Sequence, residues 1–483
     1  MRRRRSQLQS VVRVLAASGV LGTLVLLAGC GGSSSASSPT PTPTPTPGVT
    51  TAVTQVRIGD APVDRVIAFE LTIGNPVVLT PSGGGGVVNL TVGANRLELS
   101  HMSGKLEPLS IVNFPQGTYT SAAITIVNPE MTFLNSGGTQ TTLQGSATQT
   151  VTVTFNPALT IGASPAVINV DLNIANSVAT DQAGNITGFN FSGSSFTITT
   201  KAVAPEAHQE DDDGEMESIA GLVTSVSGNS FTIKVGRSGA QLTFATDATT
   251  KFSDGLVNVN SALNQIVNVE GVTRSDGTLF AEEVEGIENQ AGAETEGLVT
   301  SVTGNPATSL GFLVDDGTGN GMDDTKVGAS FTADVSGLQA SDYKLENGKV
   351  DFGGLQVGGA SFPFDPTTIH AGQRVEVESI NAMPAIAGTV VADKLKLEQQ
   401  AVNGTVSNFT TGSGGAATFD LNLPSDGSSY LTILSGQTVV HVFQQPGTDN
   451  KSGAVSNGSA VRVRGLLFWT GSGFNMIARR ITP

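Results

Sequence analysis

The chain has 483 residues, 41 acidic and 25 basic side chains, one cysteine and a formal net charge of −16. An acidic surface of this kind repels nucleic acid and anionic lipid head groups, so we expect no nucleic-acid partner. A single cysteine excludes a disulfide within one chain. The folded part must therefore be stabilised by apolar burial, for which it is long enough.

Residues 1–29 have the layout of a secretory signal peptide. Residues 2–5 and residue 13 are arginines, and residues 14–29 carry no charge. This apolar stretch is short for a membrane-spanning helix, which needs about 20 residues. It ends in Leu27-Ala28-Gly29-Cys30, which resembles the lipobox of bacterial lipoproteins.

The resemblance implies cleavage between Gly29 and Cys30 and lipid attachment to the Cys30 sulfur. Two or more acyl chains would hold the protein stably at a membrane. We therefore expect a lipid-anchored, extracytoplasmic protein of the cell membrane or outer membrane. Gly31, in place of an inner-membrane retention Asp, favours the outer membrane. The alternative is an ordinary signal peptide, or an uncleaved anchor helix, with a chance cysteine.

Residues 30–50 predict a stalk between the lipid and the folded part. Glycine and serine follow Cys30, and proline alternates with threonine over residues 39–47. Gly/Ser segments are flexible, and alternating proline favours extended polyproline II. Loss of residues 1–29 removes five arginines and no acid, so the mature net charge becomes −21.

The rest of the chain predicts an all-β fold. Residues 151–155 and 168–174 alternate apolar and polar side chains, and glycine-rich turns separate such runs. A period of two places one face of a strand in a core and the other in water. Residues 51–203 fit a β-sandwich. Residues 204–218, with four consecutive acids, are predicted to be a solvated acidic linker.

The first domain resembles domain of unknown function 4382, which is common in bacterial lipoproteins. The resemblance rests on Ile58-Gly59-Asp60-Ala61-Pro62-Val63-Asp64, on residues 97–99, and on residues 114–119 before 124–126. It implies no established activity. Asp60-Ala61-Pro62 is interpreted as a turn after a strand, in which Asp bonds to nearby backbone amides.

A weak internal repeat follows the linker. Gly221-Leu222-Val223-Thr224-Ser225-Val226 recurs at residues 297–302 and more loosely at 404–409. Each copy has a later Val-x-Val strand. The pattern resembles domain of unknown function 5666 and predicts three small oligonucleotide-binding-type (OB-like) barrels. Their predicted ranges are 219–290, 294–400 (with an insertion around residues 315–359) and 401–483.

The motifs of common catalytic sites are missing from the sequence. It has no G-x-S-x-G, P-loop or HExxH pattern. Its four histidines lie far apart in the sequence, whereas zinc and general-base sites need clustered partners. We therefore expect no catalytic residue, no cofactor and no enzymatic activity. The histidines are His101, His208, His370 and His441.

One acidic, glycine-rich loop offers the best metal candidates. Its oxygen ligands suit calcium, but it does not keep the D-x-[DN]-x-[DN]-G spacing of a calcium loop. A solvated loop is therefore the favoured interpretation. The candidate ligands are Asp315, Asp316, Asp323 and Asp324.

The last predicted module differs in charge, with five basic and three acidic residues. Arg462 and Arg464 should share a strand face, with Arg479 and Arg480 nearby. Salt bridges to the acidic module 294–400 are the preferred interpretation. The alternative is contact with an anionic envelope polymer.

Three functions remain open from the sequence. The first is a non-catalytic structural or binding protein of the cell envelope, tethered to the membrane, with an unidentified polymer or protein partner. The second is a glycan- or calcium-binding surface lipoprotein. The third is a hydrolase whose paired carboxylates meet only in the fold. They are ranked in that order.

Overall fold

A computed structural model describes residues 50–483, except 62–63, 75, 85, 91–95, 103–104, 146–147, 183, 210–211, 236–238, 287–292, 320–326, 347–361 and 381–387. The predicted signal peptide, Cys30 and all but the last residue of the stalk lie outside the described residues. Within the described part of the chain, no helix is long and apolar enough to cross a bilayer.

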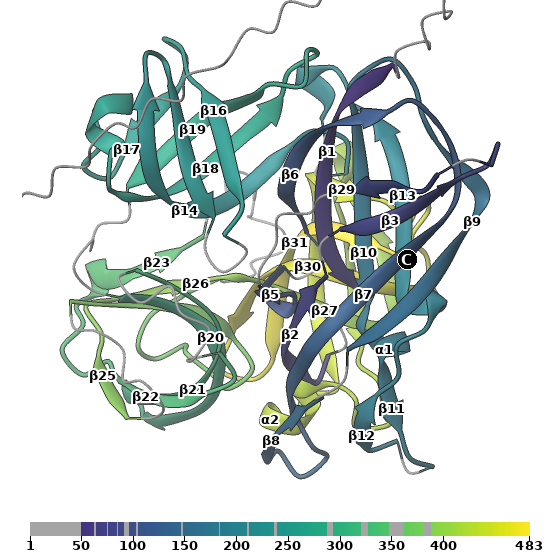
Figure 1. The fold of residues 1–483 in the computed structure, drawn as a ribbon. Coiled ribbons are helices and arrows are strands. Elements are labelled where there is room, and N and C mark those ends of the chain that lie inside the picture. The colour runs from purple at the N-terminus through teal and green to yellow at the C-terminus, as the bar shows by residue number, and fades with distance from the viewer. Residues whose placement is uncertain are drawn as a thin grey trace, which may run out of the picture. The chain divides into compact units, whose positions relative to one another are not determined.

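The fold is all-β, and its N-terminal part is a β-sandwich of two sheets (Figure 1). The first sheet has the order β13-β10-β1-β6, in which β1 and β10 are parallel. The second has the order β4-β3-β7-β2-β5, and β8 and β9 also pair with the long strand β7. The strands are β1 (Thr51–Ala61), β2 (Val66–Ile73), β3 (Val77–Pro81), β4 (Val88–Leu90), β5 (Arg96–Glu98), β6 (Leu106–Pro115), β7 (Gly117–Leu134), β8 (Gln140–Gln144), β9 (Gln149–Ile161), β10 (Ala166–Asn173) and β13 (Phe196–Ala202).

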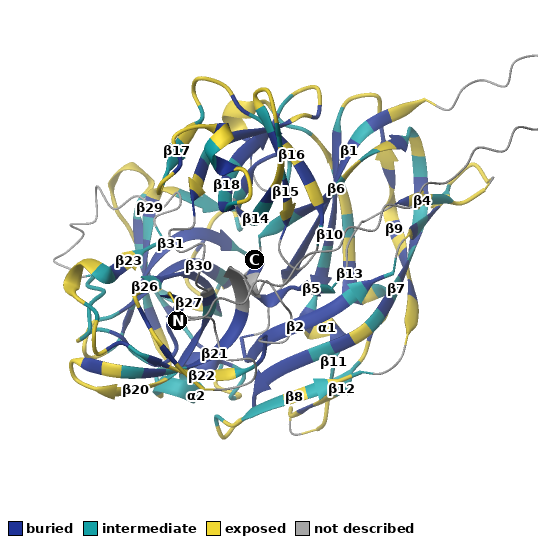
Figure 2. Cartoon of the chain, turned by 60° about the vertical axis from the view of Figure 1, so that its left-hand side comes forward, coloured by how far each residue is buried: buried dark blue, intermediate teal, exposed yellow. Residues whose placement is uncertain are grey.

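Side-chain alternation explains how the sandwich packs. Along β9, Val151, Val153 and Phe155 are buried, whereas Thr150, Thr152 and Thr154 are exposed. The buried side chains of both sheets form one hydrophobic core. Figure 2 shows the resulting change between buried and exposed positions along the strands. A short helix, α1 (Ile174–Ser177), and the hairpin of β11 (Val178–Thr180) and β12 (Ile186–Phe189) lie between β10 and β13 in sequence.

The first barrel follows the sandwich. Its pairing order is β16-β15-β14-β18-β19, and a parallel pairing of β16 with β19 closes the ring. This order, with parallel third and fifth strands, is the five-stranded OB-like arrangement. The strands are β14 (Met216–Ser227), β15 (Ser230–Val235), β16 (Gln241–Ala245), β17 (Lys251–Ser253), which also pairs with β19, β18 (Ile266–Thr273) and β19 (Leu279–Gly286).

The third barrel repeats this arrangement as a closed ring, β27-β28-β29-β31-β30, with β29 parallel to β31. A short helix, α2 (Tyr430–Ser435), lies between its second and third strands. The strands are β27 (Gln399–Thr411), β28 (Ala417–Asn422), β29 (Val439–Asn450), β30 (Ala460–Trp469) and β31 (Phe474–Thr482).

The second barrel follows the same path with a broken last strand. Ala392 and Asp393 separate β25, which is parallel to β22, from β26, which is antiparallel to β24. The strands are β20 (Ala293–Gly304), β21 (Ala307–Gly319), β22 (Ser330–Asp334), β23 (Tyr343–Leu345), β24 (Arg374–Ser379), β25 (Thr389–Val391) and β26 (Lys394–Leu397). The exact module boundaries stay predictions.

In two barrels, the structure explains why a glycine follows the repeated Val-x-Val motif. A Cβ atom at Gly271 would lie 2.1 Å from the Phe280 carbonyl oxygen, and one at Gly465 would lie 1.9 Å from that of Ile477. Both glycines occur where the register to the next strand shifts at a β-bulge. Only glycine allows so close a backbone approach. The second barrel has Ser379 after its last glutamate, and β24 pairs with β26 without a shift.

Candidate functional site

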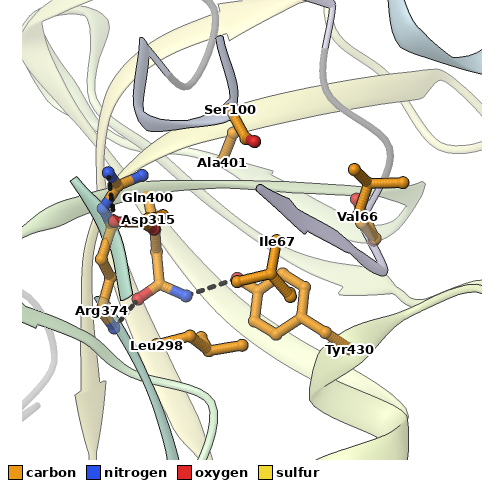
Figure 3. Close-up of a pocket in the computed structure, with 10 residues that line it drawn as sticks. Val66, Ile67, Ser100, Leu298, Asp315, Arg374, Gln400, Ala401 and Tyr430 are labelled. Carbon is orange, nitrogen blue, oxygen red and sulfur yellow. Dashed lines mark hydrogen bonds and ion pairs between the residues drawn. The ribbon is translucent and has the colours of Figure 1, made fainter. Parts of the chain in front are cut away.

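A small cavity of about 50 Å³ is lined by residues of the sandwich, the second barrel and the third barrel (Figure 3). Its walls combine aliphatic side chains with a few polar groups, as small-ligand sites commonly do. We call it the junction pocket. The sandwich supplies Asp64, Val66, Ile67 and Ser100; the second barrel supplies Leu298, Asp315 and Arg374; the third barrel supplies Gln400, Ala401 and Tyr430.

Arg374 is the cation of the junction pocket, and it is held by two carboxylates. Its Nη2 lies 3.1 Å from Asp315 Oδ1 and 3.1 Å from Glu296 Oε2. Burial alone would lower the pKa of this guanidinium, but Asp315 and Glu296 outweigh burial and raise it. Arg374 therefore stays charged, and its charge is already balanced within the second barrel.

Gln400 connects Arg374 to Tyr430. Its Oε1 accepts a hydrogen bond from the Arg374 backbone N–H at 2.7 Å. Its Nε2 donates to the Gly372 carbonyl at 2.9 Å and to the Tyr430 hydroxyl, as Figure 3 shows for the tyrosine. Burial, together with nearby Asp64, raises the pKa of Tyr430 above its usual range. Tyr430 is therefore a neutral phenol.

Asp64 is the least satisfied polar group of the pocket. It follows β1 and is 7% exposed. Its Oδ1 accepts hydrogen bonds from the backbone N–H and the side-chain amide of Asn403 in β27. Its Oδ2 is buried and has no hydrogen-bond partner among the described residues. Burial raises the pKa of Asp64 to about 7, although Asn403 and Arg462 act in the opposite direction.

A second carboxylate also reaches the third barrel. Glu217 of β14 lies 3.3 Å from Arg464 Nη1 and 2.7 Å from Arg479 Nη2. Burial would raise its pKa, but Arg464 and Arg479 outweigh burial and lower it to about 2. We call these three residues the Glu217 clamp.

The clamp adds a partner of the basic last module that the sequence did not predict. The partner was expected in residues 294–400, and Glu346 of that module does act on Arg464 through its charge, but the ion pairs of Arg464 and Arg479 are made with Glu217 in the first barrel. Arg480 pairs within its own barrel, 2.7 Å from Asp449. The strand face prediction could not identify Glu217, because it lies 247 residues from Arg464.

The structure locates part of the predicted calcium loop. Asp315 is buried, and its negative charge is balanced by an ion pair with Arg374. Asp316 lies in β21 and pairs with Glu296 in the strand register. Asp323 and Asp324 lie outside the described residues. Over the described ranges, no group of three or more His, Cys, Asp or Glu side chains is arranged to hold a metal.

Two histidines have clear local contacts. The His370 ring stacks on Trp469 with 3.8 Å between the ring centroids. His441 Nδ1 lies 2.7 Å from Asp420 Oδ1. His101 and His208 lie in separate 3₁₀ turns, Ser100–Met102 and Glu206–His208. The four residues thus lie in four separate segments of the chain.

Two buried glutamates share a lysine outside the junction pocket. Lys396 Nζ lies 2.9 Å from Glu376 and 3.3 Å from Glu398. Burial raises the pKa of both carboxyls against the effect of Lys396. Neither glutamate lines the junction pocket. The two acids that do line it differ from each other, since Asp64 has a raised pKa whereas Asp315 is paired with Arg374.

Part of the acidic segment after the sandwich is packed rather than solvated. Glu215 is buried, and its carbonyl accepts a hydrogen bond from Arg57 of β1. The Gln209 side chain bonds the backbone of Thr273 in β18. Residues 216–218 already belong to β14. Asp212, which pairs with Lys201 and whose carbonyl accepts a hydrogen bond from Asn169, therefore lies close in sequence to a polar contact between the sandwich and the first barrel.

Comparison with known proteins gives one family match, in the first barrel. Residues 220–285 match the family "Domain of unknown function (DUF5666)", as the repeat predicts for the first barrel. No curated protein matches the chain. A solved structure of a single-stranded DNA binding protein from Thermus aquaticus matches with 14% identity, 40% of this chain and 92% of that chain covered, and a TM-score of 0.14.

Two further solved structures match at similar levels. One is a Drosophila Unr fragment, CSD456, with 9% identity, 56% and 98% coverage and a TM-score of 0.13. The other is a Streptococcus pneumoniae multidomain protein with nucleic acid binding domains, with 13% identity, 55% and 73% coverage and a TM-score of 0.11.

These matches correct one prediction. The acidic charge of the chain led to the exclusion of a nucleic-acid partner, but structures that match it are described as nucleic-acid-binding proteins. That exclusion is withdrawn. Such low TM-scores give no argument for any particular ligand of this chain, since an OB-like barrel hosts many unrelated functions.

Sequence reasoning missed the junction pocket. Asp64 closes the motif at residues 58–64, which was interpreted as a structural turn. The motif was the available signal, since it places a second acid at the end of β1. No sequence pattern marked Arg374, Gln400 or Tyr430 as pocket residues, because their neighbours depend on how the modules pack together.

Proposed function

We propose that this protein is a lipid-anchored, extracytoplasmic lipoprotein whose β modules form a non-catalytic structural or binding unit of the cell envelope. One observation carries the proposal: the only cysteine of the chain is the last residue of Leu27-Ala28-Gly29-Cys30, directly before a Gly/Ser and Pro/Thr stalk. The resemblance of residues 51–203 to domain of unknown function 4382, common in lipoproteins, supports the same placement.

Contacts between modules support a structural role. The Glu217 clamp joins the first and third barrels. Gln373 Nε2 donates to the Leu467 carbonyl at 2.9 Å and joins the second and third barrels. Asp64 and Asn403 join the sandwich to the third barrel. Buried polar contacts of this kind specify one arrangement of their partners, which suits a scaffold that presents its surface in a set geometry.

The test is Cys30→Ser in cells supplied with labelled fatty acid. We expect the variant to lose the label and to keep residues 1–29, because lipidation precedes cleavage in lipoproteins. Ser33→Ala, three residues into the stalk, should be labelled and cut like the natural chain. Mass spectrometry of the N-terminus and the label are the two readouts. Unchanged labelling, or unchanged cleavage before residue 30, would overturn the proposal.

A further inference from the structure

We propose that the junction pocket binds one small monovalent cation, of the size of ammonium or potassium, which takes the place of the proton on Asp64. This inference concerns a site inside the folded part, and it does not depend on the lipid anchor. The carboxyl of Asp64 is the central ligand, and the oxygen of Tyr430 is the second.

The need for a partner follows from Asp64 itself. Only 7% of the residue is exposed to solvent. Its Oδ2 has no hydrogen-bond partner among the described residues. Proteins rarely leave a buried carboxylate unpaired; such a group is protonated or takes a counter-charge. The cavity beside Asp64 leaves room for that counter-charge.

The charged groups around Asp64 do not already supply it. Arg462 of β30 weakly favours the ionised form, but its Nε donates to Asn403 Oδ1 at 3.3 Å rather than to Asp64. Asp426, before α2, acts in the opposite direction. Across the cavity, Arg374 is paired with Asp315 and Glu296, and buried Glu98 adds another negative charge near it. The surroundings therefore hold more negative than positive charge once Asp64 ionises.

Size and ligand number select the kind of cation. A pocket of about 50 Å³ has room for an ion and one or two water molecules. A divalent ion prefers several carboxylates, and the described residues hold no suitable group of three. One carboxylate and a neutral phenol oxygen instead match a single positive charge.

Binding exchanges a proton for the ion. The O–H bond of the neutral Asp64 carboxyl breaks, the proton passes to solvent, and the carboxylate retains the electron pair and faces the cation. Because Asp64 has a pKa of about 7, the apparent affinity should fall about tenfold for each pH unit below 7 and level off above it. Each ion bound at pH 6 should release close to one proton.

The experiment is isothermal titration of the full chain in mild detergent with ammonium chloride and potassium chloride at pH 6, 7 and 8. Choline chloride at equal ionic strength is the control for bulk salt. Buffers of different ionisation enthalpy report the proton release. We expect one saturable site for ammonium or potassium, about tenfold tighter at pH 8 than at pH 6, and none for choline.

Two variants assign the site. Asp64→Asn should abolish the saturable heat, whereas Asp334→Asn, at an acid of β22 that does not line the pocket, should keep it. Tyr430→Phe should weaken binding severalfold and provides a second test if Asp64→Asn does not fold, which circular dichroism reports. Identical heats for choline, or binding that persists in Asp64→Asn or does not change with pH, would overturn the proposal. The Cys30 labelling experiment is unaffected by any of these outcomes.

Discussion

Asp64, which is buried, and Glu217, which is partly buried, are two carboxyls that join other modules to the third barrel, yet their pKa values shift in opposite directions. Asp64 has a pKa of about 7, and Glu217 has a pKa of about 2. Burial raises both pKa values. The difference lies in the partners, which are two amide N–H groups of Asn403 for Asp64 and two guanidinium groups for Glu217.

The comparison shows that burial alone does not predict the charge of a junction carboxyl. Amide hydrogen bonds offset only part of the loss of hydration, whereas two positive charges more than offset it. The Glu217 clamp therefore stabilises the module contact as a fully ionised group. Asp64 instead holds its contact as a group that changes charge near neutral pH.

The largest expected effect is that of Glu217→Gln, which removes the carboxylate that forms ion pairs with buried Arg464 and Arg479. We expect the free energy of unfolding to fall by about 3–5 kcal/mol at pH 7. Urea denaturation followed by circular dichroism measures it. Glu283→Gln is the control, since its partner Lys251 is exposed and lies 3.6 Å away, and it should cost about 0–1 kcal/mol. Equal losses in both variants would contradict the comparison.

Arg374→Met should have the next largest effect, because it leaves the buried carboxylate of Asp315 without its cation. We expect a loss of about 3 kcal/mol at pH 7, with a smaller loss at pH 4, where carboxyls protonate more easily. Thermal unfolding at both pH values measures it. Lys251→Met removes an exposed cation and serves as the control. A loss that does not depend on pH would indicate a packing effect instead.

Asp64 and Glu217 should change the free energy of unfolding in opposite directions as the pH rises. Asp64 is protonated in the folded state but ionised in the unfolded state between pH 3.8 and about 7, so its contribution to stability falls as pH rises through this window. Glu217 contributes stability above its unfolded pKa of 4.5, and this is lost as pH falls toward 2.

Asp64→Asn should therefore flatten the profile between pH 5 and 7. The change in slope should reach at most about 1.4 kcal/mol per pH unit. Asp334→Asn is the matched control, because Asp334 has a lowered pKa from its bonds to Ser336 and does not line the junction pocket. Denaturation midpoints over pH 5–8 give the slope. A profile that keeps its slope in Asp64→Asn would show that Asp64 is ionised throughout.

The smallest effect is expected for Arg464→Lys, which keeps the positive charge of the clamp but not its planar fork of donors. We expect a loss of about 1 kcal/mol, since lysine holds a carboxylate as a point charge. Arg462→Lys, at a residue that contacts an amide oxygen instead, should cost less. Urea denaturation of both variants decides between a charge effect and a geometric effect at Glu217.

Much of the fold could be predicted, and little of the site. The alternation at residues 151–155 correctly predicted the buried and exposed faces of β9, because a strand turns successive side chains to opposite faces. The repeat of Gly221-Leu222-Val223 at residues 297–302 and 404–409 correctly predicted two further barrels, because similar side-chain patterns favour similar strands. The pairing of Arg464 with Glu217 was not predicted, because charge composition does not say which strand edge another module meets.

The sequence by itself determined the all-β class, the positions of many strands and the repeated barrel, because these depend on side-chain period and glycine placement within a few residues. Only the tertiary structure decided that Asp64 lies in a pocket beside Tyr430 and that Glu217 lies between two arginines. The physical reason is that a carboxyl's protonation depends on its desolvation and on the charges within a few ångströms, and here those neighbours come from chain segments hundreds of residues away.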